Sequence, residues 1–200
     1  MKKAELRKEI RRQVHESAAL KAYLLRETTL LLDIAEVIVK AFEDGHKVLL
    51  CGNGGSAADA QHIAAELSGK FYLDRKPLPA LALTVNTSAI TAIANDYFYE
   101  DIFARQVQGL TQKGDVVIGI STSGNSPNVL NGIREAKRRG AITIAITGQG
   151  GKLGRVVDHS LEIPSKDTAR IQEIHILAGH LICFMVENII FNINKRTNKA

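Results

Sequence analysis

Apolar residues recur along this chain in two patterns, and together the patterns predict its elements. Residues 3–44 carry apolar side chains at spacings of three and four, which indicates one or two long helices. Compact apolar runs follow at 48–51, 80–85, 116–120 and 141–147, with a shorter one at 160–163. Runs of this length, bounded by turn residues, are typical of strands buried on both faces of a sheet.

Segments with helical patterns separate these strands. They begin near residue 57, cover 88–94, 102–110 and 128–139, and end with a long helix from 168 to about 192. Regular alternation of strand and helix predicts an α/β fold with a doubly wound, five-stranded parallel sheet flanked by helices. We expect a single domain over residues 1–200, with a helical segment at 1–44 and an α/β core at 45–200.

The long N-terminal helical segment carries an apolar stripe that a small domain cannot fully cover. Gly45 supplies a stop signal for it at a C′ position. The stripe predicts docking on another subunit, and so a homo-oligomer. Packing of the stripe on the chain's own sheet is the alternative.

Composition places the chain among soluble globular proteins, because 45% of its 200 residues are hydrophobic and 24% are charged. The chain does not begin with a signal-peptide pattern. No apolar run is expected to approach the roughly 18 residues that span a bilayer, and the longest candidate, residues 30–42, is interrupted by Asp33 and Glu36. Cys51 and Cys183 lie in apolar segments and are expected to be reduced core residues. These features predict a cytoplasmic protein that contacts no membrane.

The net charge of +5 raises the question of nucleic acid as a partner. Nine of the 26 cationic residues lie near the chain ends, however, among acidic and polar residues and without a nucleic-acid-binding motif. A solvated helix face explains them better, and attraction of anionic sugar phosphates is a milder possibility. These residues are Lys2, Lys3, Arg7, Lys8, Arg11, Arg12, Lys195, Arg196 and Lys199.

Residues 47–66 contain the most informative stretch for chemistry. The first strand ends in Gly52-Asn53-Gly54-Gly55-Ser56, and a helix with an acidic residue, Asp59, in its first turn is expected to start there with Ser56 as N-cap. Glycines permit a close approach of the backbone to a ligand, and a helix N-terminus favours anions. The loop therefore predicts an anion site, although tight packing alone also accounts for such a turn.

His62 and Glu66 follow on the same helix four residues apart, so both project from one face. The combination predicts an anion site beside an acid/base or metal-binding pair. A surface hydrogen bond is the simpler alternative.

A second polar loop, Ser121-Thr122-Ser123-Gly124-Asn125-Ser126-Pro127, follows the third apolar run. Ser126 and Pro127 form an N-cap and N1 pair for the next helix, and hydroxyl groups at a helix start suit phosphate oxygens. The loop lacks the Lys-Ser/Thr ending of a nucleoside-triphosphate site. Both loops are expected at the carboxyl edge of the sheet, where ligands of such folds bind.

Four segments together resemble the sugar-isomerase (SIS) domain family, and within it the phosphoheptose isomerase family, over the whole chain. They are residues 119–126, residues 51–62, the pair Asn95-Asp96, and residues 170–175 (Arg-Ile-Gln-Glu-Ile-His). The resemblance implies an aldose–ketose isomerase that acts on sedoheptulose 7-phosphate for the heptose of bacterial surface glycans. It also implies a homotetramer.

The resemblance further implies which positions carry the chemistry. Asn53, Gly54, Gly55, Asn95 and Asp96 would line the sugar, and Ser121, Thr122, Ser123 and Ser126 would hold the phosphate. His62, Glu66, Gln172 and His180 would bind zinc, with Gln172 also at the substrate. Glu66 and His180 match the family's acid/base pair. Ala169 departs from the pattern, because some members have an aspartate there.

The chemistry of these residue types fits that reaction. Aldose–ketose interconversion moves a proton between adjacent carbons through an enediol, which needs a base and a group that protonates the oxygens. A carboxylate such as Glu66 can take the carbon-bound proton, and an imidazole such as His180 can relay protons near neutral pH. A buried core histidine and a hydrogen-bonding glutamine at the helix start remain the alternatives for His180 and Gln172.

Two other functions compete with this one. The same fold occurs in a non-catalytic tetramer that binds the replication initiator protein, although such a protein has no need of His62 and His180. An isomerase of another sugar phosphate is the second. Finally, Gln172 and His180 lie about 12 Å apart along a straight helix, so a site using both needs either a bend in that helix or a residue from a neighbouring subunit. No proline lies between them, which favours the shared site.

Overall fold

The sheet of this molecule has five parallel strands in the order β2-β1-β3-β4-β5. The computed structural model describes residues 2–193. The strands are β1 (Val48–Gly52), β2 (Ala80–Ala82), β3 (Val116–Ser121), β4 (Ile142–Gly148) and β5 (His159–Ile163). One row across the sheet aligns Ala82, Leu50, Ile118, Ile144 and His159. The predicted doubly wound parallel sheet is confirmed.

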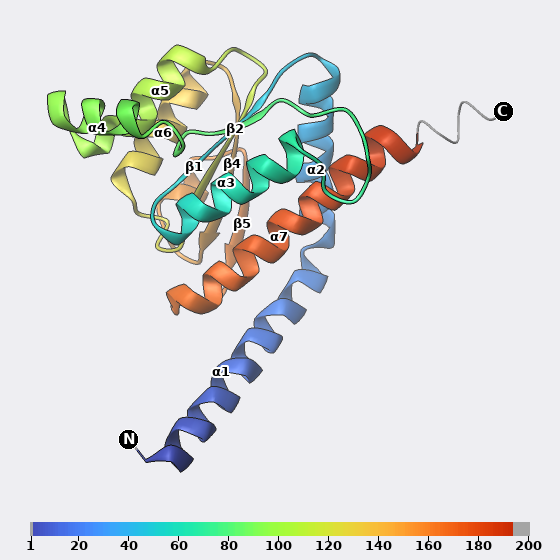
Figure 1. Cartoon of the computed structure of the whole chain (residues 1–200), viewed down its shortest axis with the longest axis vertical. Helices are drawn as coiled ribbons and strands as arrows, with labels where there is room; N and C mark the ends of the chain where they lie inside the picture. Colours follow the sequence, from blue (N-terminus) through green and yellow to red (C-terminus); the bar gives the residue numbers. More distant parts are fainter. Residues whose placement is uncertain (1, 194–200) are drawn as a thin grey trace.

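Helices cover both faces of the sheet (Figure 1). They are α1 (Lys3–Tyr23), α2 (Thr28–Glu43), α3 (Gly55–Ser68), α4 (Thr87–Asp96), α5 (Ile102–Leu110), α6 (Pro127–Arg138) and α7 (Thr168–Asn188). Short 3₁₀ turns lie at Leu24–Arg26, Tyr99–Asp101 and Leu153–Arg155, and a π-helical turn, Ile189–Ile193, extends α7. Helices α2, α3 and α7 pack on one face, and α5 and α6 pack on the other.

The period of two along each strand divides the core into two clusters. In β1, Leu50 faces the α2, α3 and α7 side, whereas Leu49 and Cys51 face the α5 and α6 side. Cys51 and Cys183 are buried and free, as predicted. Since both faces of the sheet are covered, its strands are continuous apolar runs, as the sequence indicates.

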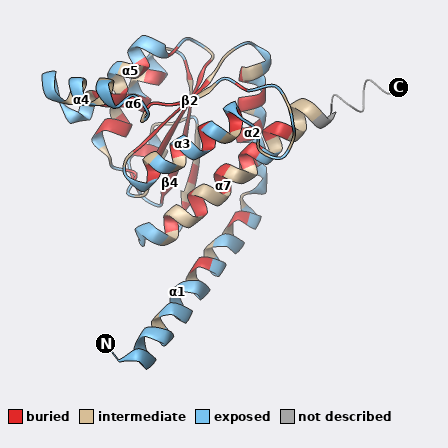
Figure 2. Cartoon of the chain, viewed as in Figure 1, coloured by how far each residue is buried: buried red, intermediate tan, exposed pale blue. Residues whose placement is uncertain are grey.

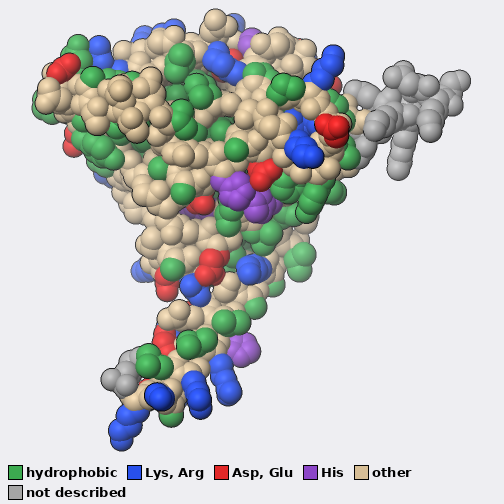
Figure 3. Space-filling model, viewed as in Figure 1, with side chains coloured by type: hydrophobic (Ala, Val, Ile, Leu, Met, Phe, Trp, Pro, Cys, Tyr) green, Lys and Arg blue, Asp and Glu red, His purple; other side chains and the backbone are tan. Residues whose placement is uncertain are grey.

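The N-terminal segment forms two helices, as expected, with a 3₁₀ turn between them. Helix α1 extends away from the body of the molecule, and most of it is exposed (Figures 1 and 2). The apolar positions of residues 20–41, from which docking on another subunit was expected, pack on the chain's own sheet instead, as the alternative proposed. The residues left uncovered lie earlier on α1, where Leu6, Ile10 and Val14 are 45%, 62% and 62% exposed. Lysine and arginine side chains gather on the same helix (Figure 3). The basic residues 195, 196 and 199 lie outside the described residues.

Three local predictions were wrong. Strand β2 covers only 80–82 at an edge of the sheet, and Val85 is 52% exposed instead of buried. Helix α4 covers Thr87–Asp96 instead of 88–94, so it includes Asn95 and Asp96 and ends after them. Helix α3 begins at Gly55 with Gly54 as N-cap, because the Gly54 carbonyl accepts the N–H groups of residues 57 and 58. Ser56 is therefore inside the helix, and Asp59 lies beyond its first turn.

The expectation that no apolar segment is long enough to span a bilayer was also wrong. Residues Thr168–Phe191 form a helix of sufficient length, with a mean hydropathy of 1.8 over its most apolar window. The helix packs on the sheet, where Ile174, Ala178 and Val186 are completely buried. Burial of one side of the helix accounts for part of its apolar composition, and 44% of that window is buried.

Candidate active site

A polar cavity of about 290 Å³ lies at the carboxyl ends of β1 and β3. These adjacent strands connect to helices on opposite faces of the sheet, so the cavity lies at the switch point of the topology, where ligands of doubly wound folds bind. Its wall combines both predicted loops and the start of α7: Asn53, Gly54, Gly55, Ser56, Ile120, Ser121, Thr122, Ser126, Thr168 and Gln172. The tertiary structure thus brings the glycine loop and the serine loop together.

The glycine loop needs glycine at two positions for different reasons. Gly54 has φ of +55°, in the left-handed region that favours glycine. A Cβ atom at Gly55 would lie 2.3 Å from Nε2 of Gln172. The bare backbone of Gly55 therefore makes room for the Gln172 amide, which places that amide at the N-terminus of α3.

In the serine loop, Ser126 is the N-cap residue of α6, as predicted, but its hydroxyl does not cap the helix. Instead, Oγ of Ser126 lies 3.0 Å from Oγ of Ser121, and the Asn128 side chain accepts the N–H of Val129. The two serine hydroxyls therefore lie together at the positive end of the α6 dipole. This arrangement suits an anion with several oxygens.

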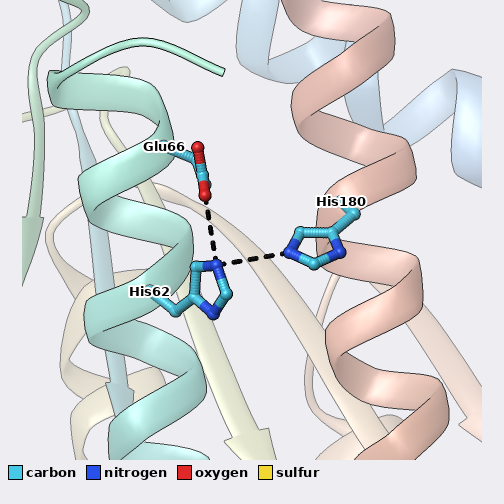
Figure 4. Close-up of side chains that lie close together, drawn as sticks. All are labelled: His62, Glu66 and His180. Carbon is cyan, nitrogen blue, oxygen red and sulfur yellow. Dashed lines mark hydrogen bonds and ion pairs between the residues drawn. The ribbon is translucent and has the colours of Figure 1, made fainter. Parts of the chain in front are cut away.

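A second, more open cavity of about 590 Å³ lies farther along α3 and α7. His62, Glu66 and His180 lie on its wall beside the aromatic residues Phe71, Tyr72 and Phe184 and the leucines Leu177 and Leu181. Nε2 of His62 is 3.1 Å from Oε1 of Glu66 and 3.3 Å from Nε2 of His180 (Figure 4). Histidine and acidic side chains reach the surface in the middle of this face (Figure 3).

These three side chains fit a metal ion. Nε2 of His62 carries at most one hydrogen and cannot donate to both of its neighbours. The lone pairs of two imidazoles and one carboxylate instead converge on one place, with all three ligand atoms within 4.8 Å of one another. Ligand atoms about 2 Å from a tetrahedral zinc ion are separated by roughly 3.3 Å. The two separations from Nε2 of His62, 3.1 and 3.3 Å, are close to that value, and the third separation is at most 4.8 Å.

The close packing of α3 against α7 brings His180 to His62. A Cβ atom at Gly179 would lie 2.6 Å from Cδ1 of Ile63, which is itself buried. The missing side chain lets the two helices approach, so residues adjacent to this contact, His62 and His180, meet at its edge. Their rings pack edge to face with centroids 4.9 Å apart.

The four predicted zinc ligands divide between the two cavities. His62, Glu66 and His180 of one chain lie together, whereas Gln172 lies two turns earlier on α7 with its amide against Gly55. The expected shared site is not tested by a single chain and stays a prediction.

Three predicted substrate residues line neither cavity. The hydroxyl of Ser123 accepts the N–H of Asn125 within its own loop, and Ser123 is exposed. Asn95 donates to the carboxylate of Asp96 at the exposed end of α4. Their assignment to the substrate remains a prediction.

Two residues near the site, Asp59 and Phe71, were not predicted. Asp59 precedes His62 by three residues on α3, and the spacing of 59, 62 and 66 on one helical face was the available signal. Burial raises the pKa of Asp59 to about 6, although the charge of His62 lowers it. Phe71 stacks on His180 with ring centroids 5.7 Å apart. No local sequence pattern marks Phe71, because its loop is ordered by contacts with α7.

Comparisons with known proteins agree with this geometry. The family model described as "SIS domain" matches residues 14–148. A protein named phosphoheptose isomerase from Maridesulfovibrio salexigens is 52% identical over 81% of this chain and 80% of its own length. Another with that name, from Aquifex aeolicus, is 51% identical over 90% of this chain and 96% of its own length.

Solved structures give the same result. The structure of phosphoheptose isomerase GmhA from Neisseria gonorrhoeae has a TM-score of 0.86 and 41% identity, covering 92% of this chain and 99% of the other. A phosphoheptose isomerase from Francisella tularensis has a TM-score of 0.88 and 36% identity, with 94% and 100% covered. The similarity extends over nearly whole chains.

Proposed function

The chain belongs to the SIS domain family and, within it, to the phosphoheptose isomerase family, and we propose the following reaction for it. It interconverts sedoheptulose 7-phosphate and D-glycero-D-manno-heptose 7-phosphate through an enediol, as an early step toward the heptose of bacterial surface glycans. The observation that carries the proposal is the position of His62, Glu66 and His180 on the same two helices, α3 and α7, that border the polar cavity.

The polar cavity holds the phosphate end of the substrate. Ser121, Thr122 and Ser126 offer hydroxyl groups at the N-terminus of α6, and Gly54 and Gly55 offer backbone at the N-terminus of α3. Ser123 joins them if its loop closes on the ligand. Asn53, Gln172, Asn95 and Asp96 contact the sugar, so the chain of carbon atoms runs from the serine loop toward the histidines.

Proton transfer takes place at the other end, beside α3 and α7. The carboxylate of Glu66 takes the proton from the carbon next to the carbonyl and returns it to the neighbouring carbon. His180 moves a proton between the two oxygens of the enediol. Phe71 stacks on the ring of His180 and holds its orientation, so that the imidazole faces Glu66 and His62.

His62, Glu66 and His180, with Gln172 as a further candidate, are the residues that would hold a zinc ion. When bound, the ion supplies positive charge that polarises the carbonyl and hydroxyl oxygens of the substrate. The argument for it is the convergence of three lone-pair donors at 3.1 and 3.3 Å.

The protein works as a cytoplasmic homotetramer in this proposal. The uncovered stripe of Leu6, Ile10 and Val14 on α1 supports assembly, since apolar stripes of this length are normally covered. A tetramer also offers a way for Gln172 of one subunit to reach the metal site of another.

A substrate panel tests the proposed function. The purified protein is given ketose phosphates of five, six and seven carbons, and the aldose products are measured together with bound metal. We expect turnover of the seven-carbon substrate well above the others. Turnover of a shorter substrate alone would support another sugar-phosphate isomerase, and no turnover of any would support a non-catalytic binding protein, which the comparisons do not favour.

A further inference from the structure

Asn53, at the end of β1, is held by two side chains from distant parts of the chain. Its Nδ2 donates to Oδ1 of Asn128 at 2.8 Å, and its Oδ1 accepts from Nδ2 of Asn128 at 2.9 Å. The hydroxyl of Tyr99 lies 3.2 Å from the same Oδ1 of Asn53. Asn128 is buried, with 1% of its surface exposed.

A backbone group fixes the direction of this network. Oδ1 of Asn128 also accepts the N–H of Val129 at 2.9 Å, and a backbone N–H can only donate. The oxygen and nitrogen of the Asn128 amide therefore cannot exchange places. Consequently the facing amide of Asn53 must turn its oxygen toward Nδ2 of Asn128, and Tyr99 must donate its hydroxyl hydrogen to that oxygen.

The hydrogen bonds leave Asn53 with one free group. Both lone pairs of its oxygen are used, by Asn128 and Tyr99, and one of the two hydrogens on Nδ2 is used by Asn128. The second hydrogen remains, and Asn53 lines the polar cavity beside Gly54 and Ser121. Asn53 can therefore only donate to a ligand in that cavity.

From this geometry we propose that Asn128 and Tyr99 are positioning residues that fix Asn53 as a hydrogen-bond donor to a substrate oxygen. The inference rests on the proposed function, because that function places the sugar against Asn53. It adds a reason for substrate choice: a hydroxyl or carbonyl oxygen of the sugar accepts from Asn53, and a group that can only donate is rejected.

Tyr99→Phe is the first test, since it removes one hydroxyl and keeps the ring. One hydrogen bond to the positioned amide is worth roughly a 3- to 10-fold change in kcat/KM. Tyr97→Phe is the matched control, because Tyr97 is a neighbouring exposed tyrosine whose ring packs on Arg105 instead. We expect Tyr99→Phe to lower kcat/KM by that factor and Tyr97→Phe to leave it unchanged.

A double-mutant cycle shows whether Tyr99 acts through Asn53. In an Asn53→Ala background, Tyr99→Phe is expected to have no further effect. Equal losses in both backgrounds would overturn the inference, as would an equal loss in Tyr97→Phe. Asn128→Asp is a second test variant, because a carboxylate can accept a hydrogen bond from Asn53 but cannot donate one to its oxygen. This variant should lower kcat/KM by roughly 10-fold or more.

The same cycle is measured by calorimetry with a heptitol 7-phosphate, which has no carbonyl and cannot be isomerised. If Tyr99→Phe and Asn53→Ala lower the affinity for this ligand non-additively, the inference is supported. If at the same time no sugar phosphate is turned over, only the proposed function is refuted. Inorganic phosphate lacks the sugar oxygen that Asn53 is proposed to contact, so it should bind all variants equally. A loss of phosphate affinity in Tyr99→Phe would mean that the variant disturbs the serine loop, and would contradict the inference.

Discussion

Arg75 and Glu187 form a buried ion pair that supports the active site, and replacing Arg75 by Met should damage both stability and turnover. The two side chains are 2% and 0% exposed, with Nε of Arg75 3.0 Å from Oε1 of Glu187. Glu187 also accepts the backbone N–H groups of Phe71, Tyr72 and Leu73. Burial raises the pKa of the Glu187 carboxyl, but these donors and the guanidinium outweigh it and hold the pKa below its usual value.

The pair is connected directly to the catalytic end of α3. Nη2 of Arg75 donates to the carbonyl of Glu66 and Nη1 to the carbonyl of Leu67, both at 2.8 Å. Glu187, in turn, holds the loop that carries Phe71, whose ring stacks on His180. The ion pair therefore determines the position of both members of the proposed acid/base pair.

Removing the guanidinium leaves a charged carboxylate in the core and takes the Arg75 donor from the Glu66 carbonyl, whereas the Leu67 carbonyl keeps the N–H of Leu78. Breaking a buried pair in this way costs about 3–5 kcal/mol. For a chain of this size each kcal/mol lowers the unfolding midpoint by about 2–4 °C, so Arg75→Met should unfold roughly 6–20 °C below wild type. In the folded fraction at 25 °C, kcat should fall by roughly 10- to 100-fold, because the proposed base and acid are misplaced.

Thermal unfolding and turnover are measured at one fixed protomer concentration, since assembly affects the midpoint. Arg138→Met is the matched control: it removes an arginine that also pairs with a glutamate, Glu135, but the Arg138 side chain is 67% exposed. The control should unfold and turn over like wild type. Equal midpoints for Arg75→Met and Arg138→Met, or unchanged kcat in Arg75→Met, would refute the reasoning.

Four further outcomes are expected. Glu66→Gln should lower turnover by roughly 10²–10⁴-fold. If the site is shared, mixing Glu66→Gln subunits with Gln172→Ala subunits should restore activity. Mixing them with His180→Ala subunits should not, because Glu66 and His180 lie in one chain. Ser126→Ala should weaken the binding of both inorganic phosphate and sugar phosphates, as measured by calorimetry. Unchanged affinity for both would show that the serine loop does not bind the phosphate. Gly179→Ala should separate α7 from α3 and lower both bound zinc, measured by elemental analysis, and turnover; full zinc content would contradict the packing argument. Burial lowers the pKa of His175 to about 4, so protons bind the unfolded chain preferentially and stability falls as pH drops from about 6.5 to 4; urea unfolding should show wild type losing about 2 kcal/mol more than His175→Leu between pH 7 and 5.

The sequence by itself determined the architecture and the two loops of the polar cavity. Apolar runs rich in Val, Ile and Leu identify strands covered on both faces, and the polar loops directly follow two of them. Because carboxyl ends of parallel strands meet at one edge of a sheet, this order of strands and loops places both loops at the same edge. The pairing of His62 with Glu66 likewise follows from helical periodicity alone.

The local errors have physical causes. Ser56 is a good N-cap residue, but Gly54 adopts a positive φ and its carbonyl accepts the first helical N–H groups, so the helix starts at Gly55. Strand β2 was expected to be buried from its apolar run, yet it forms an edge of the sheet, and edge position is a property of strand order. Neither outcome is visible in local composition.

Tertiary structure decided which side chains share a cavity. Gln172 and His180 lie on one helix, but the close contact of Gly179 with Ile63 sends His180 to His62 and leaves Gln172 at Gly55. Arg75 with Glu187, and Asn53 with Asn128, are more than 70 positions apart in sequence. Such pairs depend on how helices and loops pack on the sheet, to within fractions of an ångström, and no periodicity of a single segment encodes that distance.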